Sequence, residues 1–325
     1  MRLRLATFNI ENLGPRSGTH LPLAVRLPTL RAQLASLEAD ILCLQEVNAQ
    51  INRSSKERKL QALGQLLDGT DYANFKCAAT CRRDGDGLLD IHNLAVLSRW
   101  PIRQQRQIWN TLVPPSTYHP VRTTPAPEES DICWDRPVLY VEVDLGQAQS
   151  LHLISLHLRA PRAAYVPGAK LTSTTWKSVS GWAEGFFLAA MKQVGQALEI
   201  RMLVDSIFDG DAKARVAVAG DFNAGIHEMP VRLIRAHPQD TGNASLGYRA
   251  LVPLAPDDGA PAHTLLHGHR RLALDHVLVS SSLAANCRKI AIDNLALLDE
   301  AEPDWLGARR PGSYHAPVVV EFELS

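Results

Sequence analysis

Short apolar runs that end in polar residues recur along the whole chain, and this pattern constrains the fold more than any other feature. The runs are Arg2–Phe8, Ile41–Leu44, Leu94–Leu97, Val138–Val143, Leu151–Leu156, Val216–Ala219, His276–Val279 and Val318–Phe322. Short runs of alternating or β-branched residues predict strands. Helices are predicted at Thr29–Leu37, Lys56–Leu67 and Trp182–Ile207. Most strands follow one another too closely for a helical crossover, which favours an α+β fold of layered sheets over a doubly wound parallel sheet.

The longest predicted helix also predicts which of its side chains face the core. A spacing of three to four residues places one apolar set on a common face, namely Phe186, Leu188, Ala190, Met191, Val194, Leu198 and Met202. We expect this face to be buried. The stretches Val113–Glu129 and Val166–Gly181 are rich in turn-forming residues and predict long loops, which in a compact domain are usually either functional rims or disordered. Without a repeat or a low-complexity linker, residues 1–325 are predicted to form a single domain.

Composition excludes some classes of function. Lys and Arg total 34, as do Asp and Glu, so the formal net charge is zero. A protein whose affinity for nucleic acid comes from a global positive field is therefore excluded, although a local basic groove is not. The chain has no apolar run of about 18 residues for a membrane span, no signal-peptide pattern at its start and no CxxC pair among its five Cys. We expect a cytoplasmic location, no stable membrane association and no protein partner.

Carboxylates and amides at the strand ends suggest a metal site. Glu46 and Asp221 offer the hard oxygen ligands that Mg²⁺ prefers, with Asn9 and Asn223 as neutral helpers. So sparse a set suits an ion that keeps several waters and is completed by a substrate phosphate.

Two histidines and a further carboxylate supply proton chemistry at the same strand ends. Asp275 and His315 are predicted to pair, so that the carboxylate orients the imidazole. His157, if protonated, would give a cationic contact to a phosphoryl oxygen. Each residue alone has a structural reading, such as a solvated strand end or a turn. Their joint occurrence at successive strand ends favours metal-assisted attack of water on a phosphoester.

The ordered motifs resemble those of the endonuclease/exonuclease/phosphatase superfamily, which includes deoxyribonuclease I-like nucleases. The matching segments, between Phe8 and Phe322, are FNIENL, LQEV, LHL with His157, GDFNA, LDHVLVS and SYHAPV, together with DIHNLAVLSRWPI. The resemblance implies a four-layer α/β/β/α sandwich, in which two mostly antiparallel sheets pack face to face with helices outside. It also implies a site at one edge that binds Mg²⁺ or Mn²⁺.

Residue roles follow from the same resemblance. The implied metal ligands are Asn9, Glu46 and Asp221, of which Asp221 also activates or orients the attacking water. The implied catalytic residues are His157, Asp221, Asn223, Asp275 and His315. Arg159, Asn93 and Tyr314 are the predicted substrate-binding residues; Asp90 and Asn93 precede the LSR stretch, where the family often carries a supporting polar residue.

One departure from the family pattern concerns the metal. Tyr314 stands where the family usually has an aspartate that lies near the metal. The loss of this charge predicts weaker metal affinity or a changed metal preference. By hypothesis, the tyrosine hydroxyl hydrogen-bonds a metal-bound water.

Three functions remain in competition. The leading prediction is a divalent-metal-dependent phosphodiesterase, a nuclease acting on nucleic acid. The second is a phosphatase or phosphodiesterase acting on a small-molecule or lipid head-group phosphate. The third, motivated by Tyr314, is a catalytically weakened binding protein. Candidates for nucleic-acid contact are the pairs Arg82–Arg83, Arg159 with Arg162, and Arg270–Arg271, together with Lys170, Lys177, Tyr165, Trp176 and Trp182.

Overall fold

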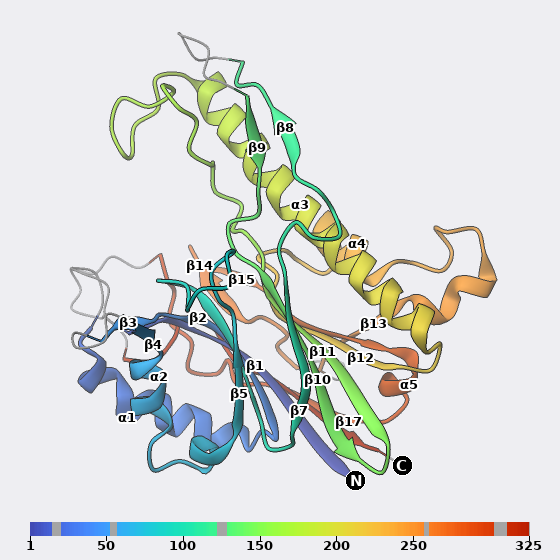
Figure 1. The fold of residues 1–325 in the computed structure, drawn as a ribbon. Coiled ribbons are helices and arrows are strands. Elements are labelled where there is room, and N and C mark those ends of the chain that lie inside the picture. The colour runs from blue at the N-terminus through green and yellow to red at the C-terminus, as the bar shows by residue number, and fades with distance from the viewer. Residues whose placement is uncertain (15–20, 53–56, 122–128, 257–259, 302–310, 325) are drawn as a thin grey trace.

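Two six-stranded sheets packed face to face form the frame of the computed structural model (Figure 1). The structure describes residues 1–14, 21–52, 57–121, 129–256, 260–301 and 311–324. The first sheet has the order β17 (Cys287–Ile292), β18 (Val318–Glu323), β1 (Arg2–Leu13), β2 (Ile41–Val47), β6 (Asn93–Ser98), β5 (Lys76–Ala79). The second has the order β13 (Leu251–Leu254), β16 (Asp275–Ser280), β12 (Arg215–Asp221), β11 (Gln149–His157), β10 (Val138–Gly146), β7 (Ile102–Ile108).

Helices cover the outer face of each sheet and complete four layers. Helices α1 (Leu23–Leu37) and α2 (Gln61–Leu67) pack on the first sheet, whereas α3 (Val179–Gly210) and α4 (Met229–Arg235) pack on the second. In β2, Cys43 lies between the sheets and Leu44 lies under the helices. Burial on both faces explains why such strands are continuous apolar runs.

The remaining elements are short. They are the strand pairs β3 (Gln50–Ile51) with β4 (Arg58–Lys59), β8 (Ser116–Tyr118) with β9 (Ser130–Ile132) and β14 (Leu265–His267) with β15 (Arg270–Leu272), the helix α5 (Ser281–Ala284), and the 3₁₀ turns η1 (Asp71–Asn74) and η2 (Ala244–Arg249). Within the described ranges, no helix is long and apolar enough to cross a membrane.

Strand direction brings the polar strand ends to one edge of the sandwich. Strand β1 runs parallel to β2, and β11 runs parallel to β12. Glu46 and Asp221 lie at the carboxyl ends of β2 and β12. Strands β18 and β16 run antiparallel to β1 and β12. Their amino ends, with His315 and Asp275, therefore meet the same edge. All other strand pairs in the two sheets are antiparallel.

The four-layer sandwich with mostly antiparallel sheets confirms the predicted fold class, but the predicted core face of the long helix was wrong. Phe186 and Met202 are 39% and 43% exposed. The face turned to the protein carries Gln193, Gln196 and Glu199 instead, interspersed with small and aliphatic residues. These polar groups are buried because each has hydrogen-bond partners on neighbouring loops.

Element boundaries also moved. Helix α1 begins six residues before the predicted Thr29. The second helix, α2, begins at Gln61, because Arg58–Lys59 form β4; the predicted start at Lys56 lies outside the described residues. The stretch Val113–Glu129 contains strand β8, and its residues 122–128 lie outside the described part. The last residues of Val166–Gly181 already belong to α3.

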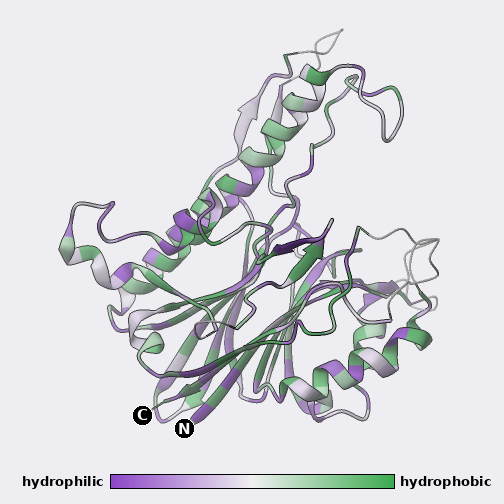
Figure 2. Ribbon diagram, turned by 180° about the vertical axis from the view of Figure 1, so that it is seen from behind, coloured by the Kyte–Doolittle hydropathy of each residue, from purple (hydrophilic) through white to green (hydrophobic). Residues whose placement is uncertain are grey.

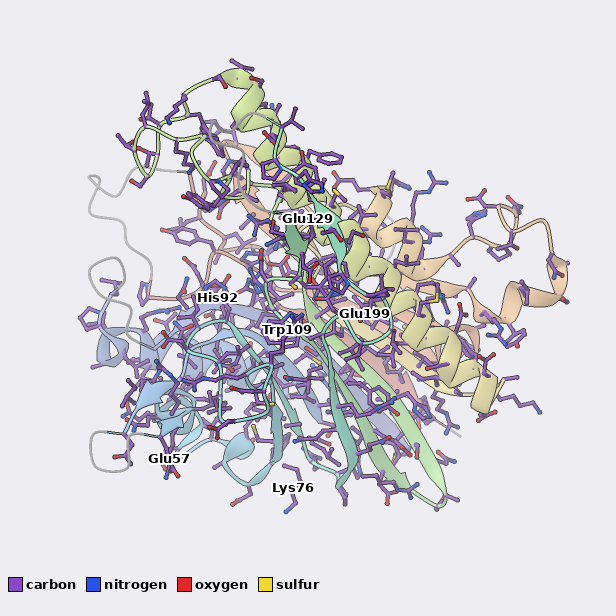
Figure 3. The ribbon with its side chains drawn as sticks, turned by 45° about the horizontal axis from the view of Figure 1, so that its top comes forward. Glu57, Lys76, His92, Trp109, Glu129 and Glu199 are labelled. Carbon is purple, nitrogen blue, oxygen red and sulfur yellow. The ribbon has the colours of Figure 1, made fainter. Side chains whose placement is uncertain are left out.

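Glu199 anchors the loop after β7 to helix α3, and its removal is expected to destabilise the fold. Its fully buried carboxylate accepts bonds from the backbone N–H groups of Asn110 and Thr111, from those of the next two residues, and from the Trp134 indole. In Figure 3, Glu199 lies partway along α3, with Trp109 beside it. Glu199→Ala leaves these donors unsatisfied and is expected to lower the free energy of unfolding by about 3 kcal/mol in urea titrations. The exposed Glu228 provides the control, because Glu228→Ala should change it by less than about 0.5 kcal/mol.

Candidate active site

A cleft of about 630 Å³ opens at the edge where the polar strand ends meet. Its lining includes Glu46, His157, Asp221, Asn223, Tyr314 and His315. A larger cavity of about 890 Å³, between α3, α4 and η2, has none of these residues in its lining. The smaller cleft is therefore the candidate active site, because carboxylates and imidazoles converge there.

Asn9, Glu46 and Asp221 form one hydrogen-bonded group across the two sheets. The Asn9 side-chain amide donates to Glu46 Oε1 at 3.3 Å and to Asp221 Oδ2 at 3.0 Å. Asn12 N–H donates to Glu46 Oε2 at 3.0 Å. Burial alone would raise the pKa of Glu46, but His92, the Asn9 amide and a nearby arginine outweigh it and lower that pKa. Glu46 is therefore held as an anion.

Arg136, which precedes β10, determines the tautomer of His157. Its Nη1 lies 3.2 Å from His92 Nδ1 and 2.5 Å from His157 Nδ1. A guanidinium can only donate, so the Nδ1 of the neutral His157 accepts and His157 carries its proton on Nε2. His157 Nε2 then donates toward Asp221 Oδ2, 3.4 Å away. Glu46, His92 and His157 lie close enough to share an ion, but in this tautomer the Nε2 of His157 carries a proton and is not a metal ligand.

Arg136, and not His157, supplies the positive charge on this side of the cleft. Burial and the charge of Arg136 hold the pKa of His157 well below its usual range, so the imidazole is neutral at pH 7. Arg136 is half-buried, and burial lowers its pKa, yet a guanidinium stays protonated. The cation facing the cleft from this side is therefore permanent.

His315 and Asp275 form the predicted pair. His315 Nδ1 lies 2.8 Å from Asp275 Oδ2, and its Nε2 faces Asp221 Oδ2 at 4.0 Å. Although burial opposes the charge, Asp275 raises the pKa of His315 to about 10. Burial and the charge of Asp275 raise the pKa of Asp221 to about 7. A protonated imidazole and a carboxylate of raised basicity thus lie side by side.

The GDFN segment shows why this turn positions Asp221 and Asn223. Gly220 has φ +151° and approaches the Leu156 carbonyl so closely that a Cβ would lie 2.0 Å from its oxygen. Asp221 Oδ1 accepts the Asn223 N–H at 2.8 Å, and the Asn223 side-chain amide donates to the Leu158 carbonyl at 3.0 Å. Asn223 and Glu46 adopt φ of 48° and 61°. Such left-handed backbone costs about 1 kcal/mol or more and concentrates at functional sites.

The Glu11 carboxylate lies beside Tyr314, the position at which the family usually has an aspartate. Glu11 Oε2 accepts the Tyr314 N–H at 3.1 Å, and both residues line the cleft. Burial raises the pKa of Glu11, and the charge of Glu46 adds to the effect. The buried Arg26 donates to the Ile10 and Glu11 carbonyls and holds the backbone of this turn.

Other sequence-predicted residues lie elsewhere or at the rim. Asn93 is fully buried and donates to the Val47 and Leu89 carbonyls, so it supports the strand end and does not line the cleft. Asp90 pairs with Arg58 and does not line the cleft either. Arg159 lies at the cleft and forms an ion pair with Asp135.

Arg136, His92 and Glu11 were missed by the reading of individual strand ends. Arg136 lies two residues before an apolar run, at the amino end of a strand that pairs antiparallel with β11. A basic residue at that position was an available signal. Glu11 stood two residues after Asn9 in the first motif, whereas nothing in the local pattern pointed to His92.

A four-layer sandwich with carboxylates, amides and imidazoles gathered at one edge defines a class of hydrolases that cleave phosphoesters. Residues 6–315 match the model of the Endonuclease/Exonuclease/phosphatase family, and the chain belongs to this family. It is a phosphoesterase hydrolase. No curated protein matches the chain.

Solved structures share the fold at low sequence identity. Truncated TDP2 of Caenorhabditis elegans is 13% identical, with a TM-score of 0.58 over 99% of this chain and 98% of that one. The 3'-5' exonuclease NExo from Neisseria meningitidis is 17% identical, with a TM-score of 0.54 over 99% and 100%. An endonuclease/exonuclease/phosphatase from Beutenbergia cavernae is 17% identical, with a TM-score of 0.55 over 100% and 72%.

Proposed function

We propose that this protein is a divalent-metal-dependent phosphodiesterase that hydrolyses nucleic acid. The observation that carries the proposal is the meeting of Asn9, Glu46 and Asp221 with the His315–Asp275 pair in one cleft. The name of a structural relative, a 3'-5' exonuclease, supports a nuclease, and a second structure of NExo is described as a 3' phosphatase bound to a DNA hairpin.

The residues present fit a divalent cation. Glu11, Glu46 and Asp221 crowd the cleft, and the pKa values of Glu11 and Asp221 are raised chiefly by burial. The buried Oδ1 of Asn12, in the same lining, accepts no hydrogen bond from any residue that the structure describes. A hard cation would relieve both features, because it takes oxygen ligands. We assign Glu46, Asn9 and Glu11 to its binding, with Asp221 adjacent; Mg²⁺ or Mn²⁺ fits this set.

The chain's own residues supply the rest of the chemistry. A bound cation would polarise the phosphoryl group and stabilise its developing charge. Asp221 orients the attacking water and accepts its proton, which its raised pKa favours. Asn223, His157 and Arg136 offer donors to the phosphoryl oxygens. Asp275 holds His315 protonated, so that its Nε2–H adds a further cationic donor.

Plasmid cleavage tests the proposed function. Supercoiled plasmid incubated with the purified protein in Mg²⁺ or Mn²⁺ is expected to be nicked, and EDTA is expected to abolish the nicking. The same reactions with a 3'-phosphorylated oligonucleotide and with a small phosphomonoester measure the rival activity. Release of phosphate from these compounds by a protein that leaves plasmid intact would replace the nuclease with a phosphatase.

Glu11 and Tyr314 give a prediction about metal affinity. Glu11→Gln removes a carboxylate from the proposed cation site and is expected to weaken Mg²⁺ binding about tenfold. Tyr314→Asp adds one beside Glu11 and is expected to strengthen it by a similar factor. Isothermal titration with Mg²⁺ measures both. Glu300→Gln, at the cleft rim on the His267 side, is the control and should leave the affinity unchanged. Unaltered affinity in Glu11→Gln and Tyr314→Asp would contradict the assignment.

A further inference from the structure

A projecting arm rises from the cleft edge of the sandwich. It consists of residues 158–189, which are the segment after β11 and the outer part of α3, and we call it the arm. Figure 1 shows the outer half of α3 extending beyond the sheets, with the preceding segment beside it. The segment starts next to His157, and Arg159 and Arg162 line the cleft. The chain thus runs directly from the candidate active site onto the arm.

The arm is positively charged although the chain as a whole is neutral. Residues 158–189 contain the four cations Arg159, Arg162, Lys170 and Lys177 and a single carboxylate, the buried Glu184. Arg159 is paired with Asp135, whereas the side-chain nitrogens of Arg162 and Lys177 have no hydrogen bond or ion pair with any of the residues described. This local excess of positive charge complements a polyanion.

Aromatic rings are exposed among these cations. Tyr165 is 71% exposed, Trp182 is 46% exposed and Phe186 is 39% exposed. The rings of Trp182 and Phe186 lie 5.6 Å apart. Figure 2 shows the outer half of α3 mostly in the colours of apolar residues. Phe186 belongs to the face that the helical periodicity wrongly assigned to the core, and among the described residues its ring is partly exposed to solvent.

Close packing fixes the arm as a preformed surface. A Cβ at Gly185 would lie 2.6 Å from the Ala164 carbonyl oxygen and 2.8 Å from the Trp176 ring. The Ala164 N–H donates to the Gly185 carbonyl at 2.7 Å. On the other side of the helix, Glu184 accepts from the Tyr118 hydroxyl at 3.1 Å. An ordered surface binds a ligand at a smaller entropic cost than a free loop.

Helix α3 also makes hydrogen bonds to the backbone of two segments that line the cleft. Gln193 donates to the carbonyls of Phe222 and Asn223 at 3.2 and 3.1 Å, and Gln196 donates to the Arg136 carbonyl at 2.8 Å. Helix α3 therefore fixes the position of the arm relative to Asn223 and Arg136, because Gln193 and Gln196 lie two to four turns along the same helix from Trp182 and Phe186.

We propose that the arm binds a single-stranded segment of nucleic acid that leaves the cleft. Unpaired bases stack on Trp182, Phe186 and Tyr165, and phosphates contact Arg162 and Lys177. Stacking is sequence-tolerant because every base has a π-face, and single-strand binding surfaces combine such rings with a basic track. The spacing of the cations along the path from the cleft favours a strand over a lipid surface. This inference rests on the proposed function and names the form of its substrate.

Binding without hydrolysis tests the arm. Fluorescence anisotropy of a labelled single-stranded 20-mer is measured with the Asp221→Asn protein in EDTA, so that the oligonucleotide stays intact. In this background, Trp182→Ala with Phe186→Ala is expected to weaken binding about tenfold. Arg162→Gln with Lys177→Gln is expected to reduce the slope of log K against log salt concentration by about 1.4, the value for two phosphate contacts on a single strand. Duplex of the same length is expected to bind more weakly.

Matched variants outside the arm control for loss of apolar surface and of charge. Met202→Ala removes an exposed apolar side chain from the inner half of α3, and Lys213→Gln removes an exposed cation just after that helix. Both should bind as the parent does, and circular dichroism checks that every variant is folded. Equal affinity of the arm variants and the parent would overturn the proposal. So would binding of anionic phosphatidylglycerol vesicles through Trp182 and Phe186 in a protein that does not bind the oligonucleotide.

The two proposals fail in different ways. If the nuclease assignment is wrong, plasmid stays intact while oligonucleotide binding still depends on the arm. If the arm assignment is wrong, plasmid is cleaved, but the arm variants bind the oligonucleotide with the same affinity as the parent. The small substrate bis(p-nitrophenyl) phosphate, which is too short to reach the arm, should be hydrolysed equally by the wild type and by a Trp182→Ala/Phe186→Ala protein that retains Asp221, because neither ring lines the cleft.

Discussion

Asp221→Asn is expected to lower the rate of phosphodiester cleavage by about 10³-fold, within the range for loss of a general base. The Asp221 carboxylate is the group in the cleft that contacts the Asn9 amide, the His157 imidazole and the Asn223 amide together. An asparagine keeps the shape of the side chain but accepts no proton from water. Initial rates of plasmid nicking at saturating Mg²⁺ measure the loss.

Asp90→Asn is the matched control for this substitution. Asp90 is exposed, pairs with Arg58 and does not line the cleft. Its variant should retain the wild-type rate within about twofold. Unfolding temperatures of both variants separate a catalytic loss from a folding defect. A folded Asp221→Asn protein that keeps a tenth or more of the wild-type rate would contradict the role given to Asp221.

Asp275→Asn is expected to move the alkaline limit of activity to lower pH. In the wild type, Asp275 opposes the effect of burial and raises the pKa of His315 to about 10. His315 is therefore protonated throughout the neutral range, and activity that depends on its charge should fall only as pH approaches 10. Without the Asp275 charge, burial dominates and the imidazole loses its proton near or below neutrality. The pH profile of kcat/KM measures the shift.

The same pair predicts a stability change with the same sign. The pKa of His315 is higher in the folded state than in the unfolded state, where the usual value is 6.5. Its contribution to stability is thus fully present below pH 6.5 and is lost as pH rises through about 10. NMR titration of the His315 ring, with exposed His269 as internal reference, checks the protonation state directly. A wild-type His315 that titrates near 6.5 would refute the prediction.

The strands and the chemical residues were readable from sequence because their signals are local. Apolar runs such as Val216–Ala219 mark strands buried on both faces, and the polar residues that follow them lie at an edge whatever the topology. The motif GDFN was readable for the same reason. The positive φ of Gly220 and the bond from the Asn223 N–H to Asp221 both arise within a few residues of the chain. The fold class and the family follow from this level.

Features that depend on partners distant in sequence were not readable. The face of α3 that is buried was misassigned because periodicity counts apolar residues, whereas Gln193 and Glu199 are buried through bonds to loops far away in the chain. Asn93 appeared to be a substrate ligand, yet its amide supports the end of β2.

By itself, the sequence determined that this chain is a layered sandwich with acids, amides and histidines at its strand ends. Only the tertiary structure decided their states: His157 neutral beside Arg136, His315 protonated beside Asp275, and Glu11 next to Tyr314. The reason is that a strand pattern is set by neighbours in the chain. A charge state is set by burial and by the groups within a few ångströms, which come here from both sheets.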